Sequence, residues 1–138
     1  MKKVLFSIHI YGLDLALLLL RGAVSIMMLR HGWTKIADFS ENLNQFADPL
    51  GLGVATSLQM AIFSEFFCSI LVALGFMTRW ALIPLIITLS IVVFVVHGED
   101  SFGSKELPLM YLVTFVFLLF SGPGKFSMDH QILKSNRY

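Results

Sequence analysis

Two long apolar segments constrain this chain most, because neither carries a charged side chain: residues 80–96 and residues 107–121. A helix in a soluble bundle needs a polar stripe along its outer face, and these segments offer none. A bilayer-spanning helix instead needs about 20 mostly apolar residues. Only 14% of the chain is charged, against roughly 25% in an ordinary soluble domain. The sequence therefore predicts an all-α integral membrane protein.

Four spans are expected within one domain of 138 residues, namely about 13–31, 54–77, 80–97 and 107–122. The last uncharged run would reach only about 22 Å as a helix, so we expect it to gain a turn at either end. The start resembles a secretory signal because Lys2 and Lys3 precede an apolar run. His9, Asp14 and Arg21 interrupt that run, which favours a retained first helix in a four-helix bundle.

Orientation follows from the basic residues in the loops and tails, which favour the cytoplasmic side. An even number of spans places both termini on one side of the membrane. The basic residues expected on that side are Lys2, Lys3, Arg79, Lys125, Lys134 and Arg137. The opposite loops are richer in acidic residues, so both termini are predicted to be cytoplasmic.

The segment 32–53 is long for a connection between two spans. It places Phe39, Leu43 and Phe46 at helical spacing, with polar residues between them. This pattern predicts a short amphipathic helix that lies on the outer membrane surface and acts as a lid. The alternative is a loop that rests on the bilayer without regular structure.

Two charged residues fall deep within the apolar spans. Counting inward from His31 and from Val54, we expect Arg21 and Glu65 to lie at the same depth, about 15–16 Å below the outer surface. A buried charge without a counter-ion is costly, so the sequence suggests an Arg21–Glu65 pair. Such a pair could be a structural lock between two helices, or it could anchor a ligand headgroup or handle a proton.

Further polar residues converge on the outer half of the predicted bundle. Asp14, Arg21, His31 and Lys35 share one face of the first span, and His97 ends the third span. A metal site needs three or four clustered ligands, so two separated histidines predict neither a metal site nor a haem site. Histidines at helix ends are more often hydrogen-bonded at the membrane interface.

Other function classes find little support in the sequence. The formal charge of +1 does not suggest nucleic acid as a partner. The single cysteine, Cys68, cannot form a dithiol couple within the chain. No dinucleotide-binding glycine motif is present, so we predict no nucleotide cofactor.

Several blocks of the sequence resemble the DoxX family. The first is "LLLRGAVSIMMLRHGWTKI", and the second is "SEFFCSILVALGFMTRWAL". The segments "VVFVVHG" and "FLLFSGPGKFSMD" are similar to the third and last blocks of the family. The resemblance covers about residues 15–130 and implies a small four-helix protein of the bacterial inner membrane. The chain carries the family's polar positions as Arg21, His31, Gly32, Lys35, Glu65, Arg79 and His97.

The resemblance also implies a link to quinone chemistry. Relatives are associated with thiosulfate:quinone oxidoreductase, with terminal quinol oxidase and with quinone or thiol stress. We therefore expect a pocket for ubiquinone or menaquinone, with Glu65 and His31 as catalytic proton-handling groups. Arg21, Lys35 and His97 would bind the headgroup, and a partner redox protein or a second copy of the chain would complete the system.

Three functional hypotheses stay open at this point. The first is a membrane subunit of quinone-linked redox metabolism, and whether the chain is itself an oxidoreductase is left open. The second is a non-catalytic scaffold or chaperone subunit, in which the buried charges serve structure only. A small transporter is a weaker third reading, because four short spans enclose little space unless they oligomerise.

Overall fold

The computed structural model describes residues 12–135, and every described element is helical. The elements are α2 (Leu13–Ala37), α3 (Phe39–Gln45), α4 (Val54–Ile62), η1 (Phe63–Cys68), α5 (Ser69–Leu74), α6 (Thr78–Ile91), η2 (Val92–Val96), α7 (Phe102–Ser121) and α8 (Met128–Ser135). The labels η1 and η2 mark π-helical turns. Lys2, Lys3, His9 and Arg137, which entered the sequence predictions, lie outside the described residues.

Three helical stretches of the described chain are long and apolar enough to cross a membrane. They are Val54–Leu74, Thr78–Val96 and Phe102–Ser121. The last helix begins before its uncharged apolar run, so the predicted gain of a turn occurs at its start. Pro84 lies inside α6 and Pro108 lies inside α7. The all-helical membrane architecture is thus confirmed, while the count of four spans stays a prediction because α2 carries several charges.

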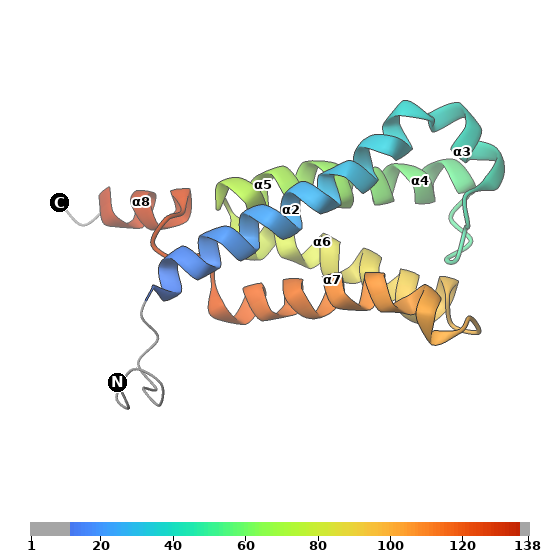
Figure 1. Cartoon of the computed structure of the whole chain (residues 1–138). Coiled ribbons are helices and arrows are strands. Elements are labelled where there is room, and N and C mark those ends of the chain that lie inside the picture. Colours follow the sequence, from blue (N-terminus) through green and yellow to red (C-terminus); the bar gives the residue numbers. More distant parts are fainter. Residues whose placement is uncertain (1–11, 136–138) are drawn as a thin grey trace.

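The long helices form a bundle with two distinct ends (Figure 1). We call the end with the start of α2, the 122–127 loop and α8 the tail end. We call the opposite end, with α3 and the 46–53 and 97–101 loops, the lid end. Helix α2 packs along α4, η1 and α5, and α6 packs against α7. The side chains of Leu58, Val72, Leu82, Leu85, Phe115 and Leu118 are fully buried between these layers.

Two glycines fix how the first two long helical stretches meet. A Cβ atom on Gly32 would lie 2.7 Å from the backbone nitrogen of Phe66, so α2 and η1 approach closely there. Gly75 has a φ of 70° and follows α5, where its N–H and that of Phe76 bond back to Val72 and Leu71. This arrangement is a Schellman ending, which suits glycine because it tolerates the left-handed conformation. The chain therefore turns tightly between α5 and α6.

The η1 turn lies near the middle of the Val54–Leu74 stretch, and the η2 turn forms the lid end of the Thr78–Val96 stretch. The η1 turn contains Glu65, and η2 ends just before His97. Wide turns of this kind inside α-helices frequently occur at functional sites, because they displace the side chains that follow them. The two π-helical turns therefore suggest a functional site in the space between η1 and η2.

Candidate functional site

A cavity of about 630 Å³ lies in the lid half of the bundle. The walls come from α2, α4, η1, α6, η2 and α7, and the roof comes from α3 and the 46–53 loop. Most of the lining is apolar, including Met28, Met60, Ile87, Val92 and Leu107. The volume falls in the range of about 300–1,000 Å³ that is usual for small-molecule sites. The bundle thus offers a partly open, largely apolar chamber with space for a ligand.

An ion pair forms part of the polar lining of this cavity. Lys35 Nζ donates a hydrogen bond to Glu65 Oε2 across 2.6 Å. The Glu65 side chain is 8% exposed and that of Lys35 is 22% exposed. A carboxylate this deep in an apolar bundle needs a nearby cation, and Lys35 supplies it. Both charged ends therefore border the chamber while neutralising each other.

The predicted Arg21–Glu65 pair is wrong. The guanidinium of Arg21 instead donates to the backbone carbonyls of Pro123 and Phe126, at 2.6 Å and 2.8 Å. Our depth estimate set His31 level with Val54. Gly32 actually lies against Phe66, which shifts the register by about 12 residues, or ~18 Å.

The shift arises because α2 continues to Ala37 and α4 extends beyond that end of α2. Arg21 then lies at the tail end, where its NH1 atom would be 2.6 Å from a Cβ atom on Gly75. Arg21 does not line the cavity. The prediction that it binds the ligand headgroup therefore finds no support in the geometry.

Two histidines line the cavity from opposite walls. The ring of His31 on α2 meets that of Tyr111 on α7 edge to face, with centroids 5.8 Å apart. The Nδ1 atom of His97 lies 2.7 Å from Asp100 Oδ2. His97 is about one-third exposed, so it borders both the cavity and the outside. Both imidazoles can exchange hydrogen bonds or protons with a molecule in the chamber.

A short helix, α3, is present in the segment where the sequence predicted one. No residue of α3 is buried, but Asn42 and Gln45 line the cavity, and the following loop adds Phe46 and Leu50. The segment thus covers the cavity, as expected of a lid. Its placement on a membrane surface stays a prediction.

Asp48 organises the loop after α3. Its carboxylate accepts hydrogen bonds from Ser57 Oγ at 2.7 Å and from the backbone N–H groups of Gly53 and Leu52 at 2.9 Å and 3.1 Å. The bond from Ser57, followed by those from the backbone, holds the pKa of Asp48 below its ordinary value. The ionised carboxylate therefore fastens the roof to the first turn of α4.

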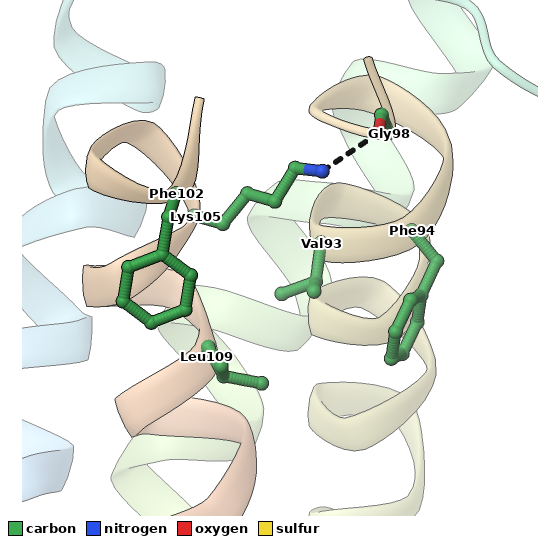
Figure 2. Close-up of a pocket in the computed structure, with 6 residues that line it drawn as sticks. All are labelled: Val93, Phe94, Gly98, Phe102, Lys105 and Leu109. Atoms are coloured by element: carbon green, nitrogen blue, oxygen red, sulfur yellow. Dashed lines mark hydrogen bonds between the residues drawn. The ribbon is translucent and has the colours of Figure 1, made fainter. Parts of the chain in front are cut away.

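Lys105 closes the hairpin between η2 and α7. Figure 2 shows its side chain reaching from α7 to the carbonyl of Gly98, a bond of 2.7 Å. Beneath it lies a smaller pocket of about 200 Å³, lined by Val93, Phe94, Phe102 and Leu109. A lysine at this place satisfies a carbonyl near the end of η2. The charged end of Lys105 therefore has its partner in this backbone carbonyl, and the residue does not line the main cavity.

Four of the five predicted site residues gather around one chamber: His31, Lys35, Glu65 and His97 all line it. Sequence reasoning missed Tyr111 and Thr88, which also line it. A tyrosine within the otherwise apolar run of α7 was the available signal. Within residues 12–135, no three His, Cys, Asp or Glu side chains are placed to hold a metal ion.

Comparison with known proteins agrees with this architecture. Two proteins of Haemophilus influenzae, both described as uncharacterized, are 29% identical to the chain. One aligns over 89% of this chain and 87% of its own length, and the other over 83% and 89%. Inner membrane protein YqjF of Escherichia coli (strain K12) is 29% identical over 88% of this chain and 95% of its own length. No solved structure matches.

The family comparison covers more than half of the chain. The DoxX family model matches residues 16–98, which include most of α2, the lid segment and the helices up to η2. Together with the three apolar helices and the inner-membrane relative, this match identifies a multi-pass inner-membrane protein. The chain therefore belongs to the DoxX family.

Proposed function

We propose that the lid-end cavity binds the polar head of a quinone-like amphipathic ligand, and that the chain is a membrane subunit of quinone-linked redox metabolism. The observation that carries this proposal is the composition of one chamber, in which His31, Lys35, Glu65 and His97 share a mostly apolar enclosure. A ligand with hydrogen-bonding oxygens on an apolar body matches that lining.

The polar groups of the chamber suit a quinone head. Lys35 can donate to a carbonyl oxygen while it stays near Glu65, since an ammonium group has three protons. Tyr111 can donate through its hydroxyl group. Glu65, His31 and His97 carry carboxylate and imidazole groups, the types that commonly serve as general acids and bases. These residues would therefore hold the two ring oxygens and move protons at them.

Electron transfer requires a second component. A bound quinone would accept two electrons and two protons, and the sequence shows neither a dinucleotide-binding glycine motif nor a cysteine cluster. We therefore assign electron supply to a partner redox protein in the same membrane. The residues of this chain would bind and orient the headgroup and shield it beneath the 46–53 loop.

A non-catalytic scaffold is the second candidate. The tail end favours it, because Phe126, Ile132 and Leu133 are exposed in and beside α8 at 57%, 45% and 66%. Exposed apolar side chains beyond the bundle are typical of protein contact sites. In this reading the cavity takes no quinone, and the Lys35–Glu65 pair stabilises the helix packing only.

A binding experiment separates the two candidates. The purified protein should carry ubiquinone or menaquinone in its lipid extract, or bind added quinone. Single changes His31→Ala, Lys35→Ala and His97→Ala should each weaken quinone affinity by about tenfold, the equivalent of one good hydrogen bond. His130→Ala is the matched control, since His130 is exposed on α8 at the tail end. Unchanged affinity in all three folded cavity variants would favour the scaffold.

A further inference from the structure

Three buried polar side chains have atoms without a hydrogen-bonding partner within residues 12–135. These atoms are Arg21 Nε, Ser25 Oγ and Ser69 Oγ, and the residues are 1%, 0% and 0% exposed. Other helical hydroxyls differ, since Ser64 and Ser90 donate to carbonyls of Ala61 and Ile86 within their own helical segments. The two unpartnered serines therefore do not use the usual intrahelical solution.

All three atoms belong to one interface. On a helical wheel, Arg21, Ser25, Met28, Gly32 and Lys35 form a stripe about 80° wide along α2. Gly75 lies against Arg21, and Phe66 lies against Gly32. Ser25 falls between these two contacts, so its hydroxyl faces the same neighbouring helix.

Ser69 lies on that neighbouring helical stretch, between the contact points Phe66 and Gly75. Interpolating between the two contacts places Ser25 and Ser69 within about one helical turn of each other in height. We call the α2–α5 interface between Arg21 and Ser69 the polar seam.

We propose that the polar seam binds internal water molecules, which hydrogen-bond to Ser25, Ser69 and the free Nε of Arg21. Burying hydroxyl groups and a guanidinium N–H without partners is unfavourable, and buried polar groups in proteins are almost always paired. Internal waters typically make about three such bonds. The three unpartnered atoms of the polar seam are enough to form the hydrogen bonds of one such water molecule. The inference is independent of whether the cavity binds quinone.

The seam adjoins the cavity at its lid side. Met28 belongs to the same stripe of α2 as Ser25 and also lines the cavity. A methionine side chain is unbranched and flexible, so it can let a water molecule pass. Ser69 follows Glu65 by four residues, about one turn away along the helix. Water in the seam would thus extend the polar lining of the cavity behind Glu65.

Arg21 closes the seam at the tail side. Its two terminal nitrogens each donate a bond to a carbonyl, of Pro123 and of Phe126, whereas Nε has no partner among the described residues. Arg21 therefore marks the tail-side end of the seam, and Met28 marks its cavity side.

The direction of a stability change tests the proposal. In a dry seam, the double change Ser25→Ala with Ser69→Ala would remove two unpaired hydroxyls and raise the thermal midpoint. In a hydrated seam, the same change deletes bonds to water and lowers the midpoint by about 3–6 °C in detergent. Ser90→Ala is the control, because it removes a helical hydroxyl whose bond stays within its own helix, to Ile86. A midpoint equal to or above that of the control would overturn the proposal.

A crystal structure of the wild-type protein provides the second test and does not require the variants to fold. We expect ordered water density within hydrogen-bonding distance of Ser25 Oγ, Ser69 Oγ or Arg21 Nε. A direct bond between the two serines, with no space for water beside Arg21, would refute the inference. Neither test depends on quinone, so both keep their meaning if the lid-end cavity binds none.

Discussion

The two ends of the bundle use buried charge in different ways. At the tail end, Arg21 bonds to two backbone carbonyls of a single loop, those of Pro123 and Phe126. At the lid end, Lys35 bonds to the side chain of Glu65 on the wall of a cavity. Backbone carbonyls cannot ionise or change rotamer, whereas a carboxylate and an ammonium group can do both. The contacts of Arg21 at the tail end are therefore fixed, whereas the Lys35–Glu65 pair at the lid end can rearrange.

Further contacts reinforce the tail end. Asp129 accepts hydrogen bonds from the N–H groups of Met77 and Thr78 and from the Thr78 hydroxyl, at 2.7–2.9 Å. This carboxylate caps the start of α6 from a distant part of the chain, which favours negative charge at a helix N-terminus. Asp14 similarly binds Lys125. The 122–127 loop and α8 thus tie the beginnings of α2 and α6 together.

The largest expected effect is the labelling difference between the two ends. If the lid end faces outward, a cysteine replacing Asn44 should react with an impermeant thiol reagent in intact spheroplasts. A cysteine replacing Ser135 should react only after lysis. Both positions are exposed, so the membrane alone should decide access.

Cys68 is 2% exposed, so the chain without added cysteines should give little background. Reaction of the Ser135→Cys variant in intact cells, with protection of Asn44→Cys, would reverse the predicted orientation of both ends.

Loss of Arg21 should cause the next largest effect. Arg21→Leu leaves two loop carbonyls without their charged donor, and such bonds contribute roughly 1.5–3 kcal/mol each. We expect a loss of about 3–6 kcal/mol in the free energy of unfolding, measured by denaturation in detergent. The 122–127 loop should also become sensitive to protease.

Glu65→Leu should be milder, because Lys35 is partly exposed and can turn toward the cavity. A contribution of about 1 kcal/mol is expected for a pair screened in this way. The losses should add within about 0.5 kcal/mol in the double variant, since the two residues act at opposite ends. If Glu65→Leu instead recovered the stability lost in Arg21→Leu, the result would support the Arg21–Glu65 pair that the sequence suggested.

The smallest expected effect concerns the roof of the cavity and pH. Hydrogen bonds lower the pKa of Asp48 in the folded state, so its contribution is present above the unfolded pKa of about 3.9. That contribution is lost as the pH falls through the lower folded pKa. The 46–53 loop should therefore open to pepsin as the pH drops from about 5 to about 2.

Asp48→Asn serves as the reference at each pH, so that the pH dependence of pepsin itself cancels. The variant should be cleaved in the loop already at the upper end of the range. Equal cleavage of both proteins at every pH would show that the ionised carboxylate does not hold the roof.

The sequence by itself determined the helical membrane architecture and the polar character of the lid end. Uncharged runs long enough to span a bilayer leave few alternatives, because backbone groups in lipid must be hydrogen-bonded within the segment. His31 and Lys35 close the first apolar run and His97 closes the third. Their convergence follows from antiparallel neighbours. Helical spacing likewise predicted α3, since its apolar residues recur at one face.

Only the tertiary structure decided which charges meet. The partner of a residue depends on the register between two helices, and the length of a connecting segment does not specify that register. The close contact of Gly32 with Phe66 sets it here, which brings Lys35 to Glu65 and carries Arg21 toward Gly75. The partners of Arg21 are also backbone carbonyls more than 100 residues away. Every residue carries such a carbonyl, so no pattern of side chains in the sequence could have identified them.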